Sequence, residues 1–127
     1  MFSTLSAHAQ THKIPFTVKD GAIWVDAKVN GFPARLKLDT GATQSVFPKK
    51  FQTVHIEREV EVRTAGGMVK AVIAPAHYEI GDLRVESTAT YLQNYIDQGL
   101  IGLDVLRQFE QVIIDFRAQT IEFIPFH

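Results

Sequence analysis

Alternation of apolar and polar residues with a period of two is the feature that most restricts the fold of this chain. It runs through residues 22–29 and again through 34–38, and it is typical of β-strands that bury one face. Between these segments, Asn30-Gly31 supplies the two residues with positive φ that a tight hairpin turn favours. This part of the sequence therefore predicts a β-hairpin whose second strand leads directly into Asp39.

The same pattern recurs along the rest of the chain. Residues 60–62 and 69–73 form a predicted hairpin around Ala65-Gly66-Gly67, and residues 112–116 and 121–124 form a closing one. Only residues 103–109 change to a helical period, and one further helical turn is expected after Pro48. Short strands at regular spacing predict an all-β fold, a small closed barrel with one short helix in the C-terminal half.

Size and charge exclude several classes of protein. The chain has 127 residues and no linker, which predicts one domain. Its 13 basic and 14 acidic residues give a net charge of -1 without a basic cluster, so nucleic acid is not expected as a partner. Apolar runs are short and interrupted by charges, so stable membrane insertion is not expected either. Cysteine is absent, which excludes disulfides and cysteine zinc sites.

The N-terminus allows two interpretations. We expect residues 1–13 to be a flexible segment and residues 14–127 to form the domain. The triplet Ala7-His8-Ala9 has the small-x-small pattern at which signal peptidase cuts, which would place the protein in the periplasm or outside the cell. An ordinary frayed terminus accounts for it equally well, because no basic region or full apolar stretch precedes the triplet.

Asp39-Thr40-Gly41 is the stretch that carries chemical information. It places a carboxylate at the end of a buried strand, next to a small hydroxyl residue and a glycine that lets another backbone approach. By itself the tripeptide is a weak signal and is more typical of a β-turn closed by an aspartate side chain. Its meaning therefore depends on the segments that follow it.

Those segments occur in an informative order. After Asp39-Thr40-Gly41-Ala42-Thr43 come a glycine-tipped hairpin, the strand Leu100-Ile101-Gly102 leading into Asp104-Val105-Leu106, and a closing hairpin with Ile114-Asp115-Phe116. From about Ile23 to Phe123 this order resembles the retropepsin-like aspartic proteases, in particular the small bacterial single-domain members.

The resemblance implies a role for each matching residue. Asp39 would be the catalytic aspartate, Thr40 would brace the active-site loop across a two-fold axis, and Gly41 would admit the substrate backbone. The other residues that the resemblance assigns are the loop residues Ala42 and Thr43, the flap residues Ala65, Gly66, Gly67 and Met68, and the residues packed on the loop, Leu100, Ile101 and Gly102.

The chemistry of such a site requires a second carboxylate. Hydrolysis of a peptide bond without a metal needs a base and an acid together, and two adjacent carboxylates that share one proton provide both. This chain has one aspartate in the right context, so a homodimer that cleaves peptides or proteins is expected, without a cofactor. Two alternatives remain: a peptide-binding or assembly module of the same fold with little or no turnover, and a small-ligand-binding barrel.

Several further segments have simpler interpretations. The apolar tail 121–126 either pairs with the same segment of a second subunit or packs on its own core. Asp104 is expected to interact with the dipole or cap of the short helix, and Asp115 to face solvent. Ser45 has no Gly-x-Ser-x-Gly context, which argues against a serine hydrolase.

Overall fold

The computed structural model describes residues 11–54, 58–95 and 97–127, and these form two β-sheets. The larger sheet has eight strands in the order β2-β3-β4-β9-β5-β8-β7-β6, and the smaller has three in the order β1-β11-β10. The triplet Ala7-His8-Ala9, on which the prediction of export depends, lies outside the described residues. No described helix is long and apolar enough to cross a membrane.

The elements in chain order are β1 (His12–Pro15), β2 (Thr17–Lys19), β3 (Ala22–Val29), β4 (Phe32–Leu38), β5 (Val46–Pro48), the 3-10 turn η1 (Lys49–Phe51), β6 (Arg58–Thr64), β7 (Gly67–Ile80), β8 (Leu83–Leu92), β9 (Leu100–Ile101), α2 (Leu103–Leu106), β10 (Gln111–Asp115) and β11 (Thr120–Ile124).

Pairing between β3 and β7 closes the large sheet on itself. Lys28 lies opposite Glu79 and Val29 opposite Tyr78, so strands β3 to β7 in the sheet order form a barrel. Phe47 lies at its centre, fully buried, and packs against the rings of Tyr78 and Tyr91 at 5.5 and 6.1 Å between centroids. The predicted all-β barrel is thus observed, and its alternating residues point into this core.

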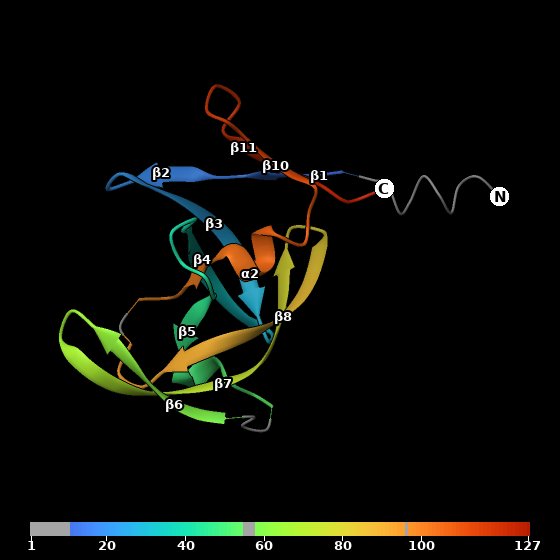
Figure 1. The fold of residues 1–127 in the computed structure, drawn as a ribbon. Coiled ribbons are helices and arrows are strands. Elements are labelled where there is room, and N and C mark those ends of the chain that lie inside the picture. Colours follow the sequence, from blue (N-terminus) through green and yellow to red (C-terminus); the bar gives the residue numbers. More distant parts are fainter. Residues whose placement is uncertain (1–10, 55–57, 96) are drawn as a thin grey trace.

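The β6–β7 hairpin extends beyond the closed part of the barrel (Figure 1). Strand β7 is 14 residues long; its second half pairs with β8 in the barrel wall, whereas its first half pairs with β6. Because β6 is the last strand of the sheet order, this hairpin has one open edge among the described strands. We call residues 58–73 the flap.

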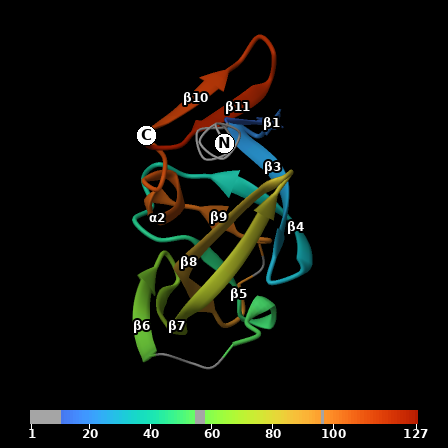
Figure 2. The same ribbon diagram turned by 90° about the vertical axis from the view of Figure 1, so that its right-hand side faces the viewer.

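The small sheet lies at the opposite end of the molecule from the flap (Figures 1 and 2). Its central strand, β11, pairs with β10 on one edge and with β1 on the other. Both backbone edges of residues 120–124 are therefore used within the chain, which decides between the two interpretations of the apolar tail. Strand β1 includes His12 and Lys13, which pair with Phe123 and Glu122.

The helix is shorter than the sequence predicts. α2 ends at Leu106, and the next residues continue in tighter turns, in which Gln108 and Phe109 donate backbone hydrogen bonds to the residues three positions earlier. These turns bring the Phe109 ring onto Phe123, with 5.1 Å between centroids. The apolar repeat of the sequence predicts a helix to residue 109, but contact of Phe109 with the small sheet accompanies an earlier end of the helix.

Candidate active site

Asp39 lies at the end of a buried strand. β4 runs parallel to β9, with Lys37 opposite Leu100 and Leu38 opposite Ile101. Beyond the last pair, the Asp39 N–H donates a hydrogen bond of 2.9 Å to the Ile101 carbonyl. The backbone of Asp39 is therefore held by the barrel, whereas its half-buried side chain belongs to the loop that follows.

The carboxylate of Asp39 is fixed on one side and open on the other. Oδ1 accepts a 2.9 Å hydrogen bond from the Gly41 N–H, and a Cβ added at Gly41 would lie 3.3 Å from this oxygen. Oδ2 has no hydrogen-bond partner in the described part of the chain. The contact to Gly41 is the aspartate turn that the tripeptide predicts by itself, so it does not distinguish a structural turn from a catalytic one.

The next loop residues face outwards. Thr40 is exposed, and its hydroxyl makes no hydrogen bond to any residue that the structure describes. Ala42 and Thr43 are bound through their backbone, because their carbonyls accept hydrogen bonds from the Leu103 and Asp104 N–H groups at 2.8 and 3.2 Å. The start of α2 thus supports the loop from behind while Thr40 stays accessible.

Gly102 lies tightly against this loop. A Cβ at this position would come within 2.8 Å of the Ala42 carbonyl oxygen and 2.8–2.9 Å of the Gln44 carbonyl group, all backbone atoms with no room to move. Leu100 and Ile101, which precede it, form β9 between β4 and β5. The segment 100–102, singled out in the sequence, therefore lies directly beside the loop of Asp39.

Asp104 has a role that the sequence did not reveal. Its Oδ1 accepts hydrogen bonds from the N–H and the hydroxyl of the fully buried Ser45, at 3.0 and 2.8 Å, and its Oδ2 accepts one of 2.8 Å from the Ser87 hydroxyl. The Ser45 hydroxyl also accepts the Gly102 N–H at 3.0 Å. Asp104 therefore joins the end of the Asp39 loop to β8 and is more than a charge at a helix start.

Tyr78 lies next to this polar cluster. Its hydroxyl lies beside Ser45, Ser87 and Asp104 in the core, but it makes no hydrogen bond of good geometry within the described structure. Burial raises the pKa of this phenol well above its usual value, and the nearby Asp104 carboxylate adds to the shift. The cluster thus contains one polar group with an unsatisfied hydrogen bond.

Tyr95 is a second residue that the sequence analysis missed. It is half-buried on the segment between β8 and β9. Burial raises the pKa of its phenol, and the carboxylates of Asp97 and Asp39 raise it further, which places the ring within electrostatic range of the candidate catalytic group. Its position shortly before Leu100-Ile101-Gly102 is the signal that could have identified it.

The flap tip is a tight turn between β6 and β7. Ala65 and Gly66 form the turn, and Gly67, with a φ of 112°, and Met68 begin β7. The Thr64 hydroxyl closes the turn, donating to the Gly67 carbonyl at 2.9 Å and accepting the Gly66 N–H at 3.2 Å. Met68 leaves 52% of its surface exposed at the end of the hairpin.

Comparison with protein families identifies this arrangement. The sequence model of the gag-polyprotein putative aspartyl protease family matches residues 25–108, a range that begins in β3 and includes the Asp39 loop, the flap and α2. The chain belongs to this aspartyl protease family. The family predicted from Asp39-Thr40-Gly41 and the segments after it is therefore confirmed.

Solved structures show the same fold. A retropepsin-like aspartic protease from Rickettsia conorii superposes with a TM-score of 0.66 over 90% of this chain and 98% of its own, at 21% sequence identity. No curated protein sequence matches the chain. The aspartyl protease family and the solved relative together confirm the all-β acid-protease fold.

Proposed function

We propose that this protein is an aspartic endopeptidase whose active site forms between two Asp39 side chains, one from each subunit of a homodimer. The observation that carries the proposal is the state of the Asp39 carboxylate. One oxygen is bound to Gly41 and the other is open, on a loop that the barrel and α2 hold in place. Membership of the aspartyl protease family supports this assignment.

The geometry of one subunit supports the requirement for a second. A single carboxylate cannot act as base and acid in the same step. When two Asp39 side chains approach closely, they share one proton, because two like charges at short distance cannot both ionise. The ionised carboxylate then takes a proton from water as the water oxygen attacks the peptide carbonyl carbon. The protonated carboxyl donates its proton to the carbonyl oxygen.

Collapse of the resulting tetrahedral intermediate breaks the C–N bond: the carboxyl that took the proton from water donates it to the leaving nitrogen, and the other carboxylate takes a proton back from a hydroxyl of the intermediate. The two apparent pKa values that govern this sequence belong to the pair of carboxyl groups and not to either residue alone. Thr40, exposed beside Asp39 and without a hydrogen-bond partner among the described residues, is available to contact the second subunit. The flap would cover a bound peptide and exclude water around the reacting bond.

Substitution of Asp39 by asparagine tests the proposal. Asp39→Asn keeps the size of the side chain and the acceptor for the Gly41 N–H, so the fold should remain intact by circular dichroism and urea unfolding. Cleavage of an unfolded protein, followed by mass spectrometry between pH 3 and pH 8, should disappear. Asp20→Asn, an exposed aspartate in the β2–β3 turn, is the matched control and should cleave at the wild-type rate. Cleavage that persists in Asp39→Asn would overturn the assignment.

A further inference from the structure

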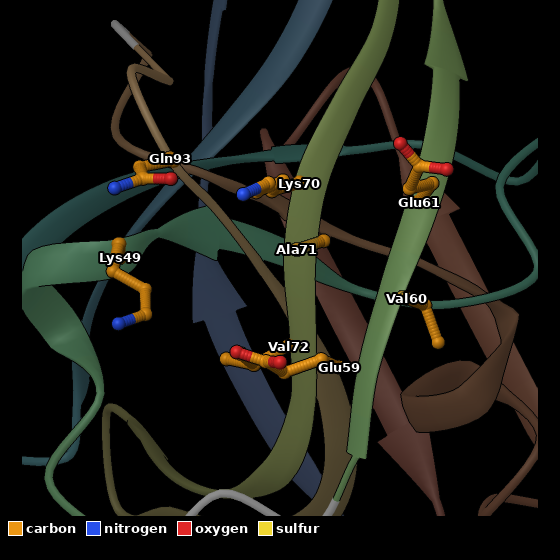
Figure 3. Close-up of a pocket in the computed structure, with 8 residues that line it drawn as sticks. All are labelled: Lys49, Glu59, Val60, Glu61, Lys70, Ala71, Val72 and Gln93. Carbon is orange, nitrogen blue, oxygen red and sulfur yellow. The ribbon is translucent and has the colours of Figure 1, made fainter.

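A pocket of about 600 Å³ opens where the flap joins the barrel (Figure 3). Residues 59–61 of β6 and 70–72 of β7 form one wall, and Lys49 and Gln93, which follow β5 and β8, form the other. The pocket is therefore bounded by the flap on one side and by the barrel on the other. Neither the family assignment nor the proposed mechanism gives the side chains of these residues a ligand.

The register of the sheet explains how these residues meet. Phe47, Tyr91 and Val72 lie side by side on β5, β8 and β7, and all three are buried. Gln93 follows β8, two residues after Tyr91, and Lys70 lies on β7, two residues before Val72. The Gln93 N–H donates a hydrogen bond to the Lys70 carbonyl at 3.4 Å. Of the buried row, Val72 lines the pocket together with Val60 and Ala71, and these three residues form its apolar floor. The other residues that line the pocket are polar and form its rim.

The polar side of the pocket carries the ends of two lysines and one glutamine. Figure 3 shows the Lys70 ammonium group pointing toward the amide oxygen of Gln93, whereas Lys49 lies below Gln93 with its ammonium group lower in the pocket. The ion pairs among the described residues involve neither lysine. A carboxylate accepts hydrogen bonds from ammonium groups such as these two, and hydrogen bonds between charged groups are the strong ones.

The acidic residues of the pocket limit what this anion can be. Glu59 lies lower, beside Val72, and Glu61 lies on β6, on the far side of Lys70 from Gln93 (Figure 3). With Lys49 and Lys70 they bring the formal charge of the lining to zero, which disfavours a polyanion. A single carboxylate can bind near the lysines, and its aliphatic stem can cover the apolar floor.

We infer that this pocket is a specificity subsite that binds an acidic side chain of the peptide substrate through the ammonium groups of Lys49 and Lys70. The inference rests on the proposed function, since it places the peptide under the flap. Lys70 is four residues from Gly66 at the flap tip, or about 13 Å along an extended strand. The selected Glu or Asp should therefore lie about four positions from the bond that is cut.

A binding experiment tests the subsite without requiring turnover. The full-length Asp39→Asn protein is immobilised and exposed to a library of degenerate decapeptides, and the retained peptides are read by mass spectrometry. We expect Glu and Asp to be enriched about tenfold over Gln and Asn at one position, the effect of one good charged hydrogen bond. Lys49→Met and Lys70→Met, which keep the aliphatic stem, should each reduce the enrichment several-fold, and the double variant should remove it.

Lys28→Met is the matched control, because Lys28 is an exposed lysine on β3 outside the pocket. It should retain the full enrichment. Retention of no peptides, retention without acidic enrichment, or enrichment that survives in the double variant would each overturn the subsite. The same library cut by the wild-type protein separates the two proposals: acidic enrichment in the binding arm without any cleavage contradicts the endopeptidase and leaves the binding site standing.

Discussion

Asp104 and Ser45 are joined by two hydrogen bonds, in which one carboxylate oxygen accepts both the backbone N–H and the hydroxyl of the serine at 3.0 and 2.8 Å. Ser45 is the residue at which the Asp39 loop ends and β5 is about to begin. Its hydroxyl in turn accepts the Gly102 N–H. The loop is therefore fixed at its start by the Asp39–Ile101 backbone bond and at its end by Asp104.

Removal of the Asp104 carboxylate should destabilise the protein and loosen the loop. Asp104→Ala leaves the Ser45 N–H and hydroxyl and the Ser87 hydroxyl without their acceptor, which we expect to lower the free energy of unfolding by about 2–4 kcal/mol. Asp104→Asn keeps an acceptor oxygen for Ser45 and should lose less. Urea unfolding measures both.

The control for these variants is Glu110→Ala, an exposed acid shortly after α2 whose side chain makes no hydrogen bond within the described structure. It should change the free energy of unfolding by less than about 0.5 kcal/mol. An Asp104→Ala protein as stable as this control would show that the network contributes nothing to the loop.

Gly102→Ala should damage the site by steric contact. The added methyl group would meet backbone atoms of Ala42 and Gln44 at 2.8–2.9 Å, so the Asp39 loop must shift, at a cost of about 1–3 kcal/mol. We expect lower stability in urea and a fall in kcat for peptide cleavage. Gly66→Ala is the comparison, because its nearest contact would be the Thr64 hydroxyl at 3.9 Å, and it should unfold like the wild type.

Tyr78 should make the protein less stable in alkali. Its phenol has an ordinary pKa of 10.0, which burial raises in the folded protein, so the unfolded chain loses this proton first. The contribution of the Tyr78 phenol to the free energy of unfolding is fully present below about pH 10. It falls as the pH rises toward the folded-state pKa, by at most about 1.4 kcal/mol per pH unit.

Tyr78→Phe removes this titration together with a buried hydroxyl that lacks a good hydrogen bond. We expect a variant that at pH 7 is as stable as the wild type or more stable by up to about 1 kcal/mol. Between pH 10 and pH 11 it should lose stability less steeply. Urea unfolding at a series of pH values measures both effects, and parallel pH curves for the two proteins would contradict the assignment.

The need for two Asp39 residues predicts dominant inhibition. When wild-type protein is mixed with a ninefold excess of Asp39→Asn and subunits exchange, only about one tenth of the wild-type chains find a wild-type partner. The cleavage rate should fall to about that fraction, whereas an excess of Asp20→Asn should raise it. A rate unaffected by Asp39→Asn would show that one subunit is sufficient.

How far the sequence predicts the fold depends on whether the determining interactions are local. The β3–β4 hairpin was predictable because alternation and Asn30-Gly31 act within a few residues of one another. The end of α2 was not, since Phe109 leaves the helical path for a contact with Phe123, which lies far along the chain. Pairing of β1 with β11 was missed for the same reason: short polar segments carry little signal until a distant edge is available to them.

For the candidate site, the sequence by itself determined the family, the single Asp-Thr-Gly loop and the glycine that lies against it, because these depend on residue types that only a close-packed loop requires. Only the tertiary structure decided that Asp104 binds Ser45 and Ser87, that Tyr95 lies near Asp39, and that Lys49 and Lys70 line one pocket. Asp104, for example, is 17 residues from Ser87 and 59 residues from Ser45 along the chain. Side chains without a local pattern acquire partners only when the barrel closes.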